Sequence, residues 1–445
     1  MAPRLNAQLK VLMNGHLLGW LRSSSRGAVS FVYEESWLSS DNRRPISLSL
    51  PLSNREYHGQ VVENYFDNLL PDSFSIRSRL QARVGAETSR CFDLLAQIGR
   101  DCVGALQLLP EGEDVDVHSV KADQLTEEEI ESILKNYRTM PLGVDLKADF
   151  RISVAGAQEK TAFLKLGDNW YRPYGATPTS HIFKLPIGEL GQSGIDLSES
   201  IENEWLCQQI LDAFGIPIAV TEMMKFGEQK VLVVERFDRR WSADRTWLMR
   251  LPQEDMCQAA GISGSLKYGD EGGPGMRVIM DILLGSKQSH RDRTIFMTGQ
   301  LLFWMLAAID GHAKNFSIFH MRRGLYRMAP LYDVMSVHPI IEAGQIDKQR
   351  VRMAMAVQGK SRHYRQDMIC RRHWLEAARK LRFSQDDMAD IIERCCDQIN
   401  GVINDVSDLI PRDFPEIIAD AVFSGLRSSR ERLVKERELN NLNTN

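Results

Sequence analysis

The chain has 445 residues, of which 43% are hydrophobic and 26% charged, and its formal net charge is −4. This length predicts about two or three domains with substantial cores, and the small net charge gives no overall reason to expect a nucleic-acid partner. The seven cysteines contain no Cys-x-x-Cys pair, so neither a disulfide framework nor a zinc site is expected. The start of the sequence lacks the apolar run of a signal peptide, and no apolar stretch reaches the roughly 18 residues of a membrane span, so we expect a soluble, cytoplasmic protein.

Residues 1–112 are predicted to form a small β-rich subdomain. The Asn14-Gly15 pair between two apolar runs is a strong hairpin signal, and apolar residues alternate with polar ones in the next two runs. The expected strands span 9–13, 16–21, 29–33 and 46–50, and the expected short helices span 65–70 and 91–98. No catalytic set of residues occurs here, so we interpret this region as regulatory or as a dimerisation domain.

Residues 113–252 are predicted to form a nucleotide-binding region. An acidic loop and a helix over 126–137 lead to a turn of small residues and then to a strand over 161–166. The small side chains of Ala155, Gly156 and Ala157 leave backbone N–H groups open to phosphate oxygens. A segment of this kind is also typical of an ordinary tight turn, so its motif is weak by itself.

A lysine stands inside the next apolar strand, over 181–186. Lys184 either faces solvent or, like the strand lysine of kinases, pairs with the phosphates of ATP. The following helix, over 197–214, offers Glu202 and Glu204 as partners for this lysine, and the sequence does not decide between them.

An apolar strand over 231–234 then runs into the connector Glu235-Arg236-Phe237. Kinases place at this point the hinge whose backbone holds adenine. Phe237 is equally compatible with a place in the core, so the residues alone leave both interpretations open.

Residues 253–445 are predicted to be mostly helical, with helices over 276–284, 294–309, 374–381, 385–403 and 414–426. Asp310 and Asn315 have the Asp-x4-Asn spacing of a kinase catalytic loop, and a hairpin that turns at Arg323-Gly324 leads to a second acid, Asp333. In phosphoryl transfer one Asp orients the substrate hydroxyl and accepts its proton, while an Asn and a second Asp hold Mg²⁺. The alternative is that Asp310 forms a turn and Asn315 caps the hairpin.

One stretch differs from the rest of the chain in charge. Between Lys348 and Arg382 there are eleven Lys or Arg residues and only two acids, a net charge of +9. Scattered basic residues are ordinary on a solvated helix face, but a local excess of this size favours a surface for a polyanion such as duplex DNA.

Three strings resemble the bacterial HipA family of toxin kinases, and the resemblance runs along the whole chain. The strings are FRISVAGAQEK at 150–160, LPQEDMCQ at 251–258 and DGHAKNFS at 310–317. The resemblance implies an α+β fold of the protein-kinase-like (HipA-like) kind. It has a small β-rich N-terminal subdomain, a mixed α/β nucleotide-binding lobe and an all-α C-terminal domain.

The resemblance also implies roles for individual residues. Asp310 matches the catalytic residue, and Asn315 and Asp333 match the Mg²⁺ ligands. Ser153 matches a serine whose autophosphorylation, in this family, expels the phosphate loop and inactivates the kinase. The implied ATP-binding residues are Ala155, Gly156, Ala157, Gln158, Glu159, Lys160, Lys184, Glu235, Arg236, Phe237, His312, Ala313, Lys314, Asn315, Tyr332 and Asp333, and the implied DNA contacts are Arg379, Lys380 and Arg382.

The partners and the activity follow from the same resemblance. It implies a serine/threonine protein kinase toxin that uses ATP and Mg²⁺ to modify glutamyl-tRNA synthetase, which starves translation and induces dormancy. The family's antitoxin partner is HipB, a small helix-turn-helix dimer, and the pair represses its operon on operator DNA, at the nucleoid.

Two departures from eukaryotic kinases and two alternative functions complete the sequence analysis. No His-Arg-Asp precedes Asp310, and Val334 follows Asp333 in place of Phe-Gly, so activation-loop control of the eukaryotic kind is not expected. The first alternative is a DNA-bound corepressor with a vestigial kinase site. The second is a small-molecule kinase, which shares the Asp-x4-Asn loop.

Overall fold

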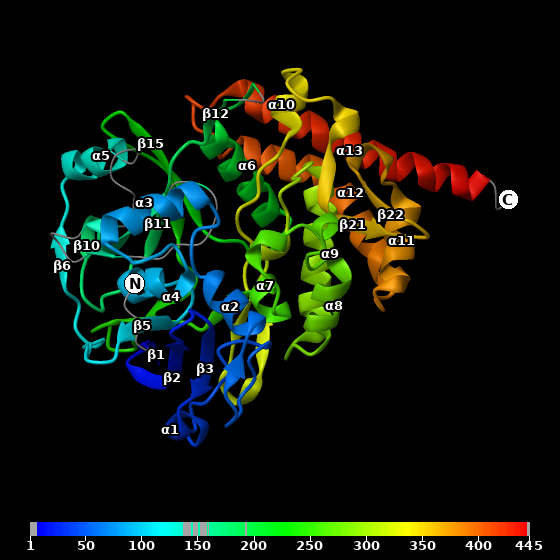
Figure 1. Cartoon of the computed structure of the whole chain (residues 1–445). Helices are drawn as coiled ribbons and strands as arrows, with labels where there is room; N and C mark the ends of the chain where they lie inside the picture. The colour runs from blue at the N-terminus through cyan, green and yellow to red at the C-terminus, as the bar shows by residue number, and fades with distance from the viewer. Residues whose placement is uncertain are drawn as a thin grey trace. The chain divides into compact units, whose positions relative to one another are not determined.

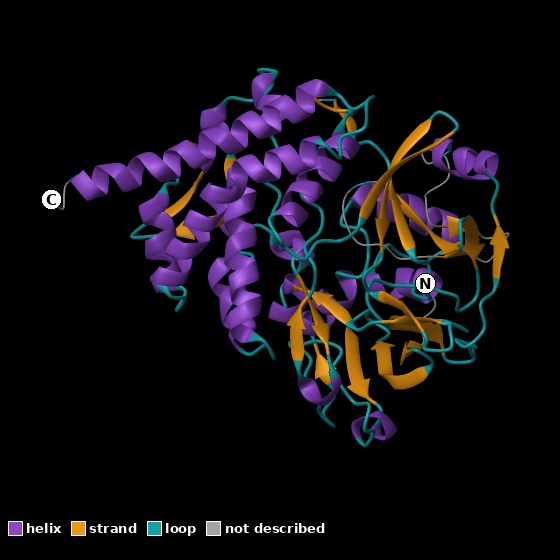
Figure 2. Ribbon diagram, turned by 180° about the vertical axis from the view of Figure 1, so that it is seen from behind, coloured by secondary structure: helices purple, strands orange, loops and turns teal. Residues whose placement is uncertain are grey.

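The computed structural model describes residues 7–136, 144–145, 150–151, 158, 160–191 and 194–442 (Figure 1). The chain divides into two compact units that alternate along the sequence. Unit 1 comprises Met1–Leu185, Glu222–Ser265 and Ser317–Tyr326, and unit 2 comprises Pro186–Thr221, Leu266–Phe316 and Arg327–Asn445. The three consecutive regions expected from the sequence, 1–112, 113–252 and 253–445, stay a prediction. Most strands belong to unit 1 and most helices to unit 2. Figure 2 draws the strands in orange and the helices in purple.

Unit 1 begins with an antiparallel five-stranded sheet of order β4-β3-β2-β1-β5. The predicted hairpin is confirmed: β1 and β2 meet at Asn14 (φ 48°) and Gly15 (φ 81°), the left-handed pair that a tight hairpin requires. Helices pack on this sheet around one apolar core. The elements are β1 (Ala7–Met13), β2 (His16–Ser23), β3 (Val29–Tyr33), α1 (Glu35–Leu38), β4 (Tyr57–His58), α2 (Gln60–Asp67), α3 (Phe74–Val84), α4 (Cys91–Ile98) and β5 (Leu106–Pro110).

The strand predicted over 46–50 is wrong. Only an isolated bridge joins Ser47 and Leu50. The Tyr33 hydroxyl accepts from the Ile46 N–H (2.9 Å) and donates to the Leu50 carbonyl (2.5 Å), while the Leu48 N–H donates to Glu254 (2.9 Å). Side chains therefore satisfy backbone groups that a strand partner would otherwise take.

The second sheet of unit 1 has six strands in the order β14-β15-β11-β9-β10-β6. Its core includes Phe163, Trp170, Phe183 and Phe226, whose rings meet edge-on or tilted. The strands are β6 (Ala122–Gln124), β9 (Lys160–Leu166), β10 (Asn169–Pro173), β11 (His181–Lys184), β14 (Thr221–Phe226) and β15 (Gln229–Glu235). Helix α5 (Glu127–Lys135) packs on β15. It begins at a capping box formed by Thr126 and Glu129.

Shorter elements complete unit 1. They are β7 (Val144–Asp145), β8 (Phe150–Arg151), β16 (Arg239–Trp241), β17 (Leu248–Arg250), β18 (Gln253–Asp255), α7 (Met256–Ala260) and β19 (Ser317–His320), the last paired with β18 and with β20 (Tyr326–Met328). The hairpin from β19 to β20 is confirmed, and its turn has Arg323 (φ 65°) and Gly324 (φ 72°) in the left-handed region.

Unit 2 is a helical assembly in which α12 contacts α6, α9, α11 and α13. Its helices are α6 (Ser200–Ala213), α8 (Met276–Leu284), α9 (Ser289–Met305), α10 (His338–Glu342), α11 (Arg371–Lys380), α12 (Gln385–Ser407) and α13 (Glu416–Leu442). Helix α9 ends before the predicted residue 309 because Ala307 adopts a left-handed φ of 49° and the Ala308 N–H turns back to Phe303. No helix among the described residues has the length and apolar character needed to cross a bilayer.

The C-terminal region is mainly helical but not all-helical. It contains the strand pair β21 (Arg352–Gln358) and β22 (Arg362–Arg365), and unit 2 also has the short pair β12 (Gly188–Leu190) and β13 (Ile195–Leu197). Val351, Met353, Met355 and Val357 are buried at every second position. The sequence shows the same period of two, with basic residues around it.

Candidate functional site

The residues predicted to carry catalysis lie in a short loop after α9. The Asp310 side chain is 58% exposed, whereas the His312 side chain is 5% exposed. The His312 N–H donates to the Asp310 carbonyl (2.8 Å), and the Asn315 N–H donates to the His312 carbonyl (3.0 Å). A Cβ atom on Gly311 would overlap the ring of Phe303, so only glycine fits between Asp310 and His312. The loop thus exposes the Asp310 carboxylate to solvent, while the residues that follow it are buried.

Asn315 joins the two predicted acids. Its Nδ2 group donates to the Asp310 carbonyl (3.0 Å) and to the Asp333 carbonyl (3.1 Å). Asn315 as a whole is 2% exposed. These two bonds use the amide NH₂ and leave the oxygen Oδ1 as the ligand atom of this side chain. The structure therefore brings Asp310, Asn315 and Asp333 together through these two backbone contacts, and their catalytic and Mg²⁺-binding roles stay predictions.

Asp333 has a left-handed backbone, with φ at 63°. The segment before it is anchored in unit 2: the Leu331 N–H donates to Pro217, and the Ala219 N–H donates to Leu331, both at 2.8 Å. The Tyr332 hydroxyl donates to the Lys314 carbonyl (2.7 Å). A non-glycine residue in this conformation is strained, and such strain persists where surrounding contacts impose it, most often at functional sites.

The donor set fits Mg²⁺. Asn315 supplies an amide oxygen and Asp333 a carboxylate, both oxygen ligands of the kind that Mg²⁺ prefers. Among the described residues no group of three or more His, Cys, Asp or Glu side chains could hold a metal ion. Mg²⁺ is usually held by one or two protein ligands together with water and substrate phosphates, so a two-ligand site suits it.

Tyr268 is a residue of this loop region that the sequence analysis missed. Its hydroxyl donates to Asp310 Oδ1 at 2.5 Å, and its ring meets the His312 ring edge-on at 5.2 Å. The sequence offered one indirect sign, because Tyr268 opens a turn that contains Gly269, Gly272 and Gly273.

Of the predicted phosphate-loop residues, the structure describes Gln158 and Lys160. The Gln158 side chain donates to the Leu185 carbonyl, and Lys160 stands opposite Lys184 in the pairing of β9 with β11. Lys184 is 7% exposed, so it does not face solvent. The predicted residues Ser153, Ala155, Gly156, Ala157 and Glu159 lie outside the described residues. Glu202 and Glu204 belong to unit 2 and Lys184 to unit 1, so the choice between the two acids as its partner stays open.

The predicted hinge has a buried support. All three guanidinium nitrogens of Arg236 donate within unit 1, to the carboxylates of Asp101 and Asp238, to the Thr179 hydroxyl and to the Cys102 carbonyl. The Arg236 N–H also donates to Ser180 (2.9 Å). The side chain of Arg236 therefore braces the connector from inside, while Glu235 is exposed.

Phe237 is half-buried, and its ring meets the Phe319 ring edge-on at 5.8 Å within unit 1. This contact accounts for one side of the ring. The hinge role of Glu235, Arg236 and Phe237 in holding a nucleotide stays a prediction.

Two more arginines complete this ion cluster, which consists of Asp101, Arg236, Asp238, Arg239 and Arg250. Every side chain in it is at most 6% exposed. Burial would raise the pKa of Asp101, but the three guanidinium groups beside it hold that pKa well below its usual range. Burial is also the main cause that lowers the pKa of Arg239, to about 10, so it stays charged at neutral pH.

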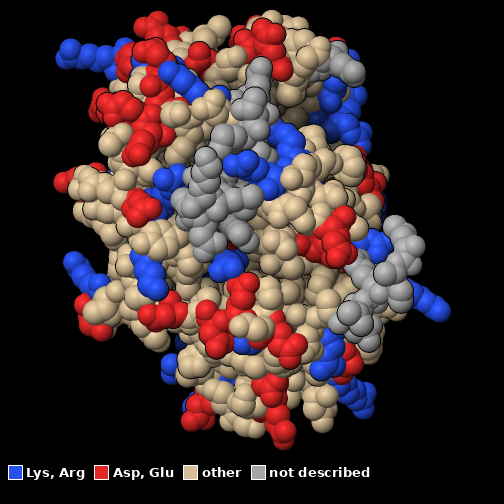
Figure 3. Space-filling model, turned by 60° about the vertical axis from the view of Figure 1, so that its left-hand side comes forward, with Lys and Arg blue, Asp and Glu red and all other residues tan. Residues whose placement is uncertain are grey.

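The predicted DNA contacts lie at the carboxyl end of α11. Arg379 and Arg382 are exposed, whereas Lys380 is half-buried and its Nζ donates to the Gly359 carbonyl. On the face drawn in Figure 3, acidic and basic side chains are mixed. The basic residues between 348 and 382 belong to unit 2.

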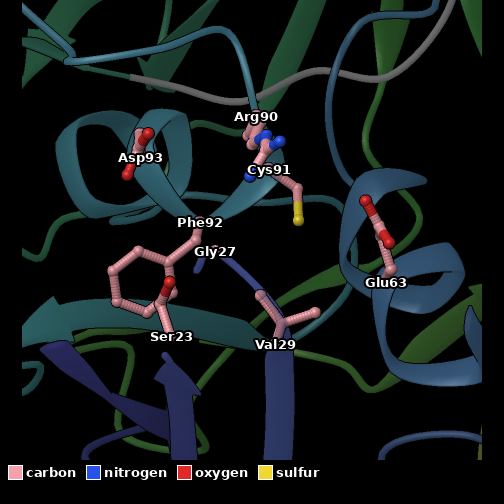
Figure 4. A pocket seen from close by; sticks show the side chains of 8 residues that line it. All are labelled: Ser23, Gly27, Val29, Glu63, Arg90, Cys91, Phe92 and Asp93. Carbon is pink, nitrogen blue, oxygen red and sulfur yellow. The ribbon is translucent and has the colours of Figure 1, made fainter. Parts of the chain in front are cut away.

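A small pocket in unit 1 involves none of the predicted site residues. It lies between the end of β2, the start of β3, α2 and α4, and Figure 4 shows its lining: Ser23, Gly27, Val29, Glu63, Arg90, Cys91, Phe92 and Asp93. Burial raises the pKa of the Cys91 thiol to about 12, so this thiol stays protonated and unreactive at neutral pH.

Comparisons with known proteins place this geometry in context. A family model described as "HipA-like C-terminal domain" matches residues 152–403, and one described as "HipA N-terminal domain" matches residues 9–109. "Putative kinase Y4mE" of Sinorhizobium fredii is 32% identical over 74% of this chain and 77% of its own length. "Serine/threonine-protein kinase toxin HipA" of Shewanella oneidensis is 27% identical over 68% of this chain and 69% of its own. In fold, the chain matches the Shewanella oneidensis complex of HipA, HipB and operator DNA with a TM-score of 0.80 at 22% identity, covering 96% of this chain and 97% of that one.

Proposed function

Because this chain belongs to the HipA family of kinase toxins, we propose that it transfers the γ-phosphoryl group of ATP to serine or threonine hydroxyls of a protein, with Asp310 serving the acceptor. The observation that carries this proposal is that Asn315 joins Asp310 and Asp333 by two hydrogen bonds of one amide group. If Asp310 only formed a turn and Asn315 only capped the hairpin, Asn315 would not need to bond the backbone of both acids.

The proposed chemistry assigns each side chain one task. The exposed Asp310 carboxylate accepts a hydrogen bond from the acceptor hydroxyl, orients its oxygen toward the γ-phosphorus and takes its proton as the new O–P bond forms and ADP leaves. Asn315 Oδ1 and the Asp333 carboxylate would hold Mg²⁺, which supplies charge neutralisation at the phosphates when bound. Lys184, with the segment 155–160, is assigned to the phosphates of ATP, and the connector 235–237 to adenine.

The first prediction tests this assignment. Asp310→Asn should lower kcat by at least roughly 100-fold, because the variant cannot take the proton, while ATP affinity stays unchanged. The measurements are phosphate transfer to glutamyl-tRNA synthetase and to casein, and ATP binding by titration calorimetry.

The matched control is Asp408→Asn, which removes the same charge from an exposed position at the end of α12. This variant should transfer phosphate at the normal rate. Turnover near normal in Asp310→Asn would remove that residue from the proposed role.

We further propose that the protein is the toxin of a HipBA-type pair. A solved structure with the same fold holds HipA with HipB and operator DNA, and this supports a helix-turn-helix antitoxin and operator DNA as partners here. The proposed target is glutamyl-tRNA synthetase, whose modification would stop translation and promote dormancy, and Ser153 is the proposed site of inactivating autophosphorylation.

A corepressor with a vestigial kinase site is the second candidate. A corepressor would need the basic residues of α11 to bind DNA. It would have no need for the Asn315 amide to join Asp310 and Asp333. Normal repression without any transfer of phosphate by the wild-type protein would favour this candidate.

A further inference from the structure

We propose that Tyr268 is a positioning residue for the catalytic carboxylate, and this inference rests on the proposed role of Asp310. The phenol O–H donates to Asp310 Oδ1 at 2.5 Å. It would fix the rotation of a side chain that is otherwise 58% exposed, and it engages one carboxylate oxygen while Oδ2 remains for the acceptor hydroxyl.

Two further contacts tie the neighbourhood of Tyr268 to the same loop. The Ala313 N–H donates to the Lys267 carbonyl (3.3 Å), and the Tyr268 ring meets the His312 ring edge-on at 5.2 Å with an interplanar angle of 80°. Two consecutive residues, Lys267 and Tyr268, therefore contact the catalytic loop at Asp310, His312 and Ala313. The phenol reaches Asp310 as part of this fixed arrangement.

The turn that carries Tyr268 is tightly built. The Glu271 N–H (3.2 Å) and the Gly273 N–H (2.9 Å) both donate to the Tyr268 carbonyl. A Cβ atom on Gly273 would overlap the Leu266 carbonyl, so the backbone closes on itself with no room for a side chain. A turn of this kind holds its residues in place.

The same turn is seated on β21. A Cβ atom on Gly269 would lie only 3.2 Å from the Ala354 carbonyl oxygen, so the turn and β21 are in close contact. Asp270 also forms an ion pair with Arg352 at 3.4 Å. A tyrosine that blocked the acceptor site until it was displaced would need a mobile support. The support here is packed on a strand and closed by backbone bonds, and this favours positioning over blocking.

The physical benefit is preorganisation. A short hydrogen bond to a charged oxygen is among the stronger kinds. A carboxylate already held in the productive orientation saves the cost of ordering it in the transition state. Tyr268→Phe removes this one bond and keeps the ring on His312, so kcat should fall by roughly 10-fold while KM for ATP stays unchanged.

The experiment is a double-mutant cycle on the full chain. Transfer of phosphate to glutamyl-tRNA synthetase and to casein is measured for wild type, Tyr268→Phe, Asp310→Asn and the double variant. If Tyr268 acts only through Asp310, the double variant should be no slower than Asp310→Asn alone. If Tyr268 merely supported the fold, Tyr268→Phe would lower the rate by the same factor in the wild type and in Asp310→Asn.

The control is Tyr57→Phe, which removes a phenol hydrogen bond to the Pro51 carbonyl (2.6 Å) in unit 1 and should leave kcat unchanged. Unaltered thermal unfolding of Tyr268→Phe shows that its loss of rate does not come from misfolding. An unchanged or raised kcat in Tyr268→Phe, or additive losses in the double variant, would overturn the positioning role while the kinase proposal stands. If wild type and Asp310→Asn transfer phosphate equally, the proposed role of Asp310 fails first and this inference fails with it.

Discussion

Asp101 lies in the ion cluster of unit 1, where it meets three arginines. Arg239 is 2.8 Å away, Arg250 is 3.1 Å away and Arg236 is 3.2 Å away. Asp101 also accepts from the Thr179 hydroxyl (2.8 Å), just before β11. The Asp101 carboxylate thus bonds both the connector after β15, through Arg236 and Arg239, and the segment before β11, through Thr179.

We predict that Asp101→Asn destabilises the protein by about 3–5 kcal/mol at pH 7, because it leaves buried guanidinium groups without their counter-charge. The folded pKa of Asp101 lies below its unfolded value of about 3.9. The stabilisation is therefore full above that value and is lost as pH falls through it toward the folded pKa. Urea unfolding at pH 7 and at about pH 3 should show the difference between wild type and variant shrinking in acid.

Asp408→Asn serves again as the control, since an exposed residue should change stability by no more than about 0.5 kcal/mol. A difference between wild type and Asp101→Asn that stays constant with pH would show that the carboxylate is not the source of the stabilisation.

Single residues also show what sequence spacing can and cannot reveal. Asp310 and Asn315 were found because kinase chemistry fixes their separation within one loop. Tyr268 contacts Asp310 across 42 residues, and Arg236 contacts Asp101 across 135 residues. No local pattern marks such pairs, because only the fold brings them together.

At the scale of elements, α11 has its carboxyl end fixed by two arginines from other helices. Arg277 of α8 donates to the Lys380 carbonyl (2.5 Å), and Arg293 of α9 donates to the carbonyls of Leu381 and Arg382 (2.7 Å each). Cations at this end also suit the helix dipole. The exposed Arg379 and Arg382 are therefore presented from a fixed helix end.

We predict that Arg379→Ala combined with Arg382→Ala weakens binding of the complex with its HipB-like antitoxin to operator DNA. The slope of log affinity against log salt concentration should fall by about 1 for each DNA phosphate that the variant no longer neutralises. The measurement is fluorescence anisotropy of a labelled operator duplex over a series of salt concentrations, with kinase activity unchanged.

The control variant is Arg26→Ala with Arg55→Ala, which removes two exposed charges from unit 1. An unaltered salt slope in the α11 variant would mean that these residues do not bind phosphates. Lys380 is left out because its side chain is bonded to Gly359.

Elements differ in how well the sequence predicts them. Helices α4 and α8 were predicted at their observed bounds, and α11 and α12 to within about four residues, since their apolar periodicity is local. The strand over 46–50 was wrong because Tyr33 and Glu254 take its backbone bonds, and Glu254 lies 206 residues from Leu48. β21 was missed although apolar residues recur at alternate positions along it, and β22 was missed because its four residues show no such pattern.

At the scale of the whole molecule, the proposed control by Ser153 can be tested on intact protein. We predict that incubation with Mg²⁺ and ATP adds one phosphate at Ser153, about −1.5 to −2 charges. This charge would repel the phosphates of ATP, so the modified protein should bind ATP poorly, be inactive and be cleaved faster by protease between 152 and 160. Intact mass, peptide mapping and limited proteolysis measure these effects.

Asp310→Asn is the control here, since it should acquire no phosphate and keep the slower cleavage. An active enzyme whose Ser153 remains unmodified would contradict this mechanism. Ser153→Ala should lose activity if the hydroxyl also helps to close the loop.

The alternation of the two units along the chain has a consequence for biosynthesis. β18 pairs with β19, and the buried Glu254 of β18 meets His320 of β19 at 2.8 Å, although the two strands belong to distant parts of the sequence. A ribosome emits the chain from its amino end at about 5–20 residues per second. Strand β18 and the Glu254 side chain therefore remain without β19, on the order of seconds, until residues 317–320 have been made. A nascent chain therefore cannot complete unit 1 before the loop at residues 310–315 has been translated, and a chain that stops short of residue 317 leaves the buried Glu254 without its histidine partner.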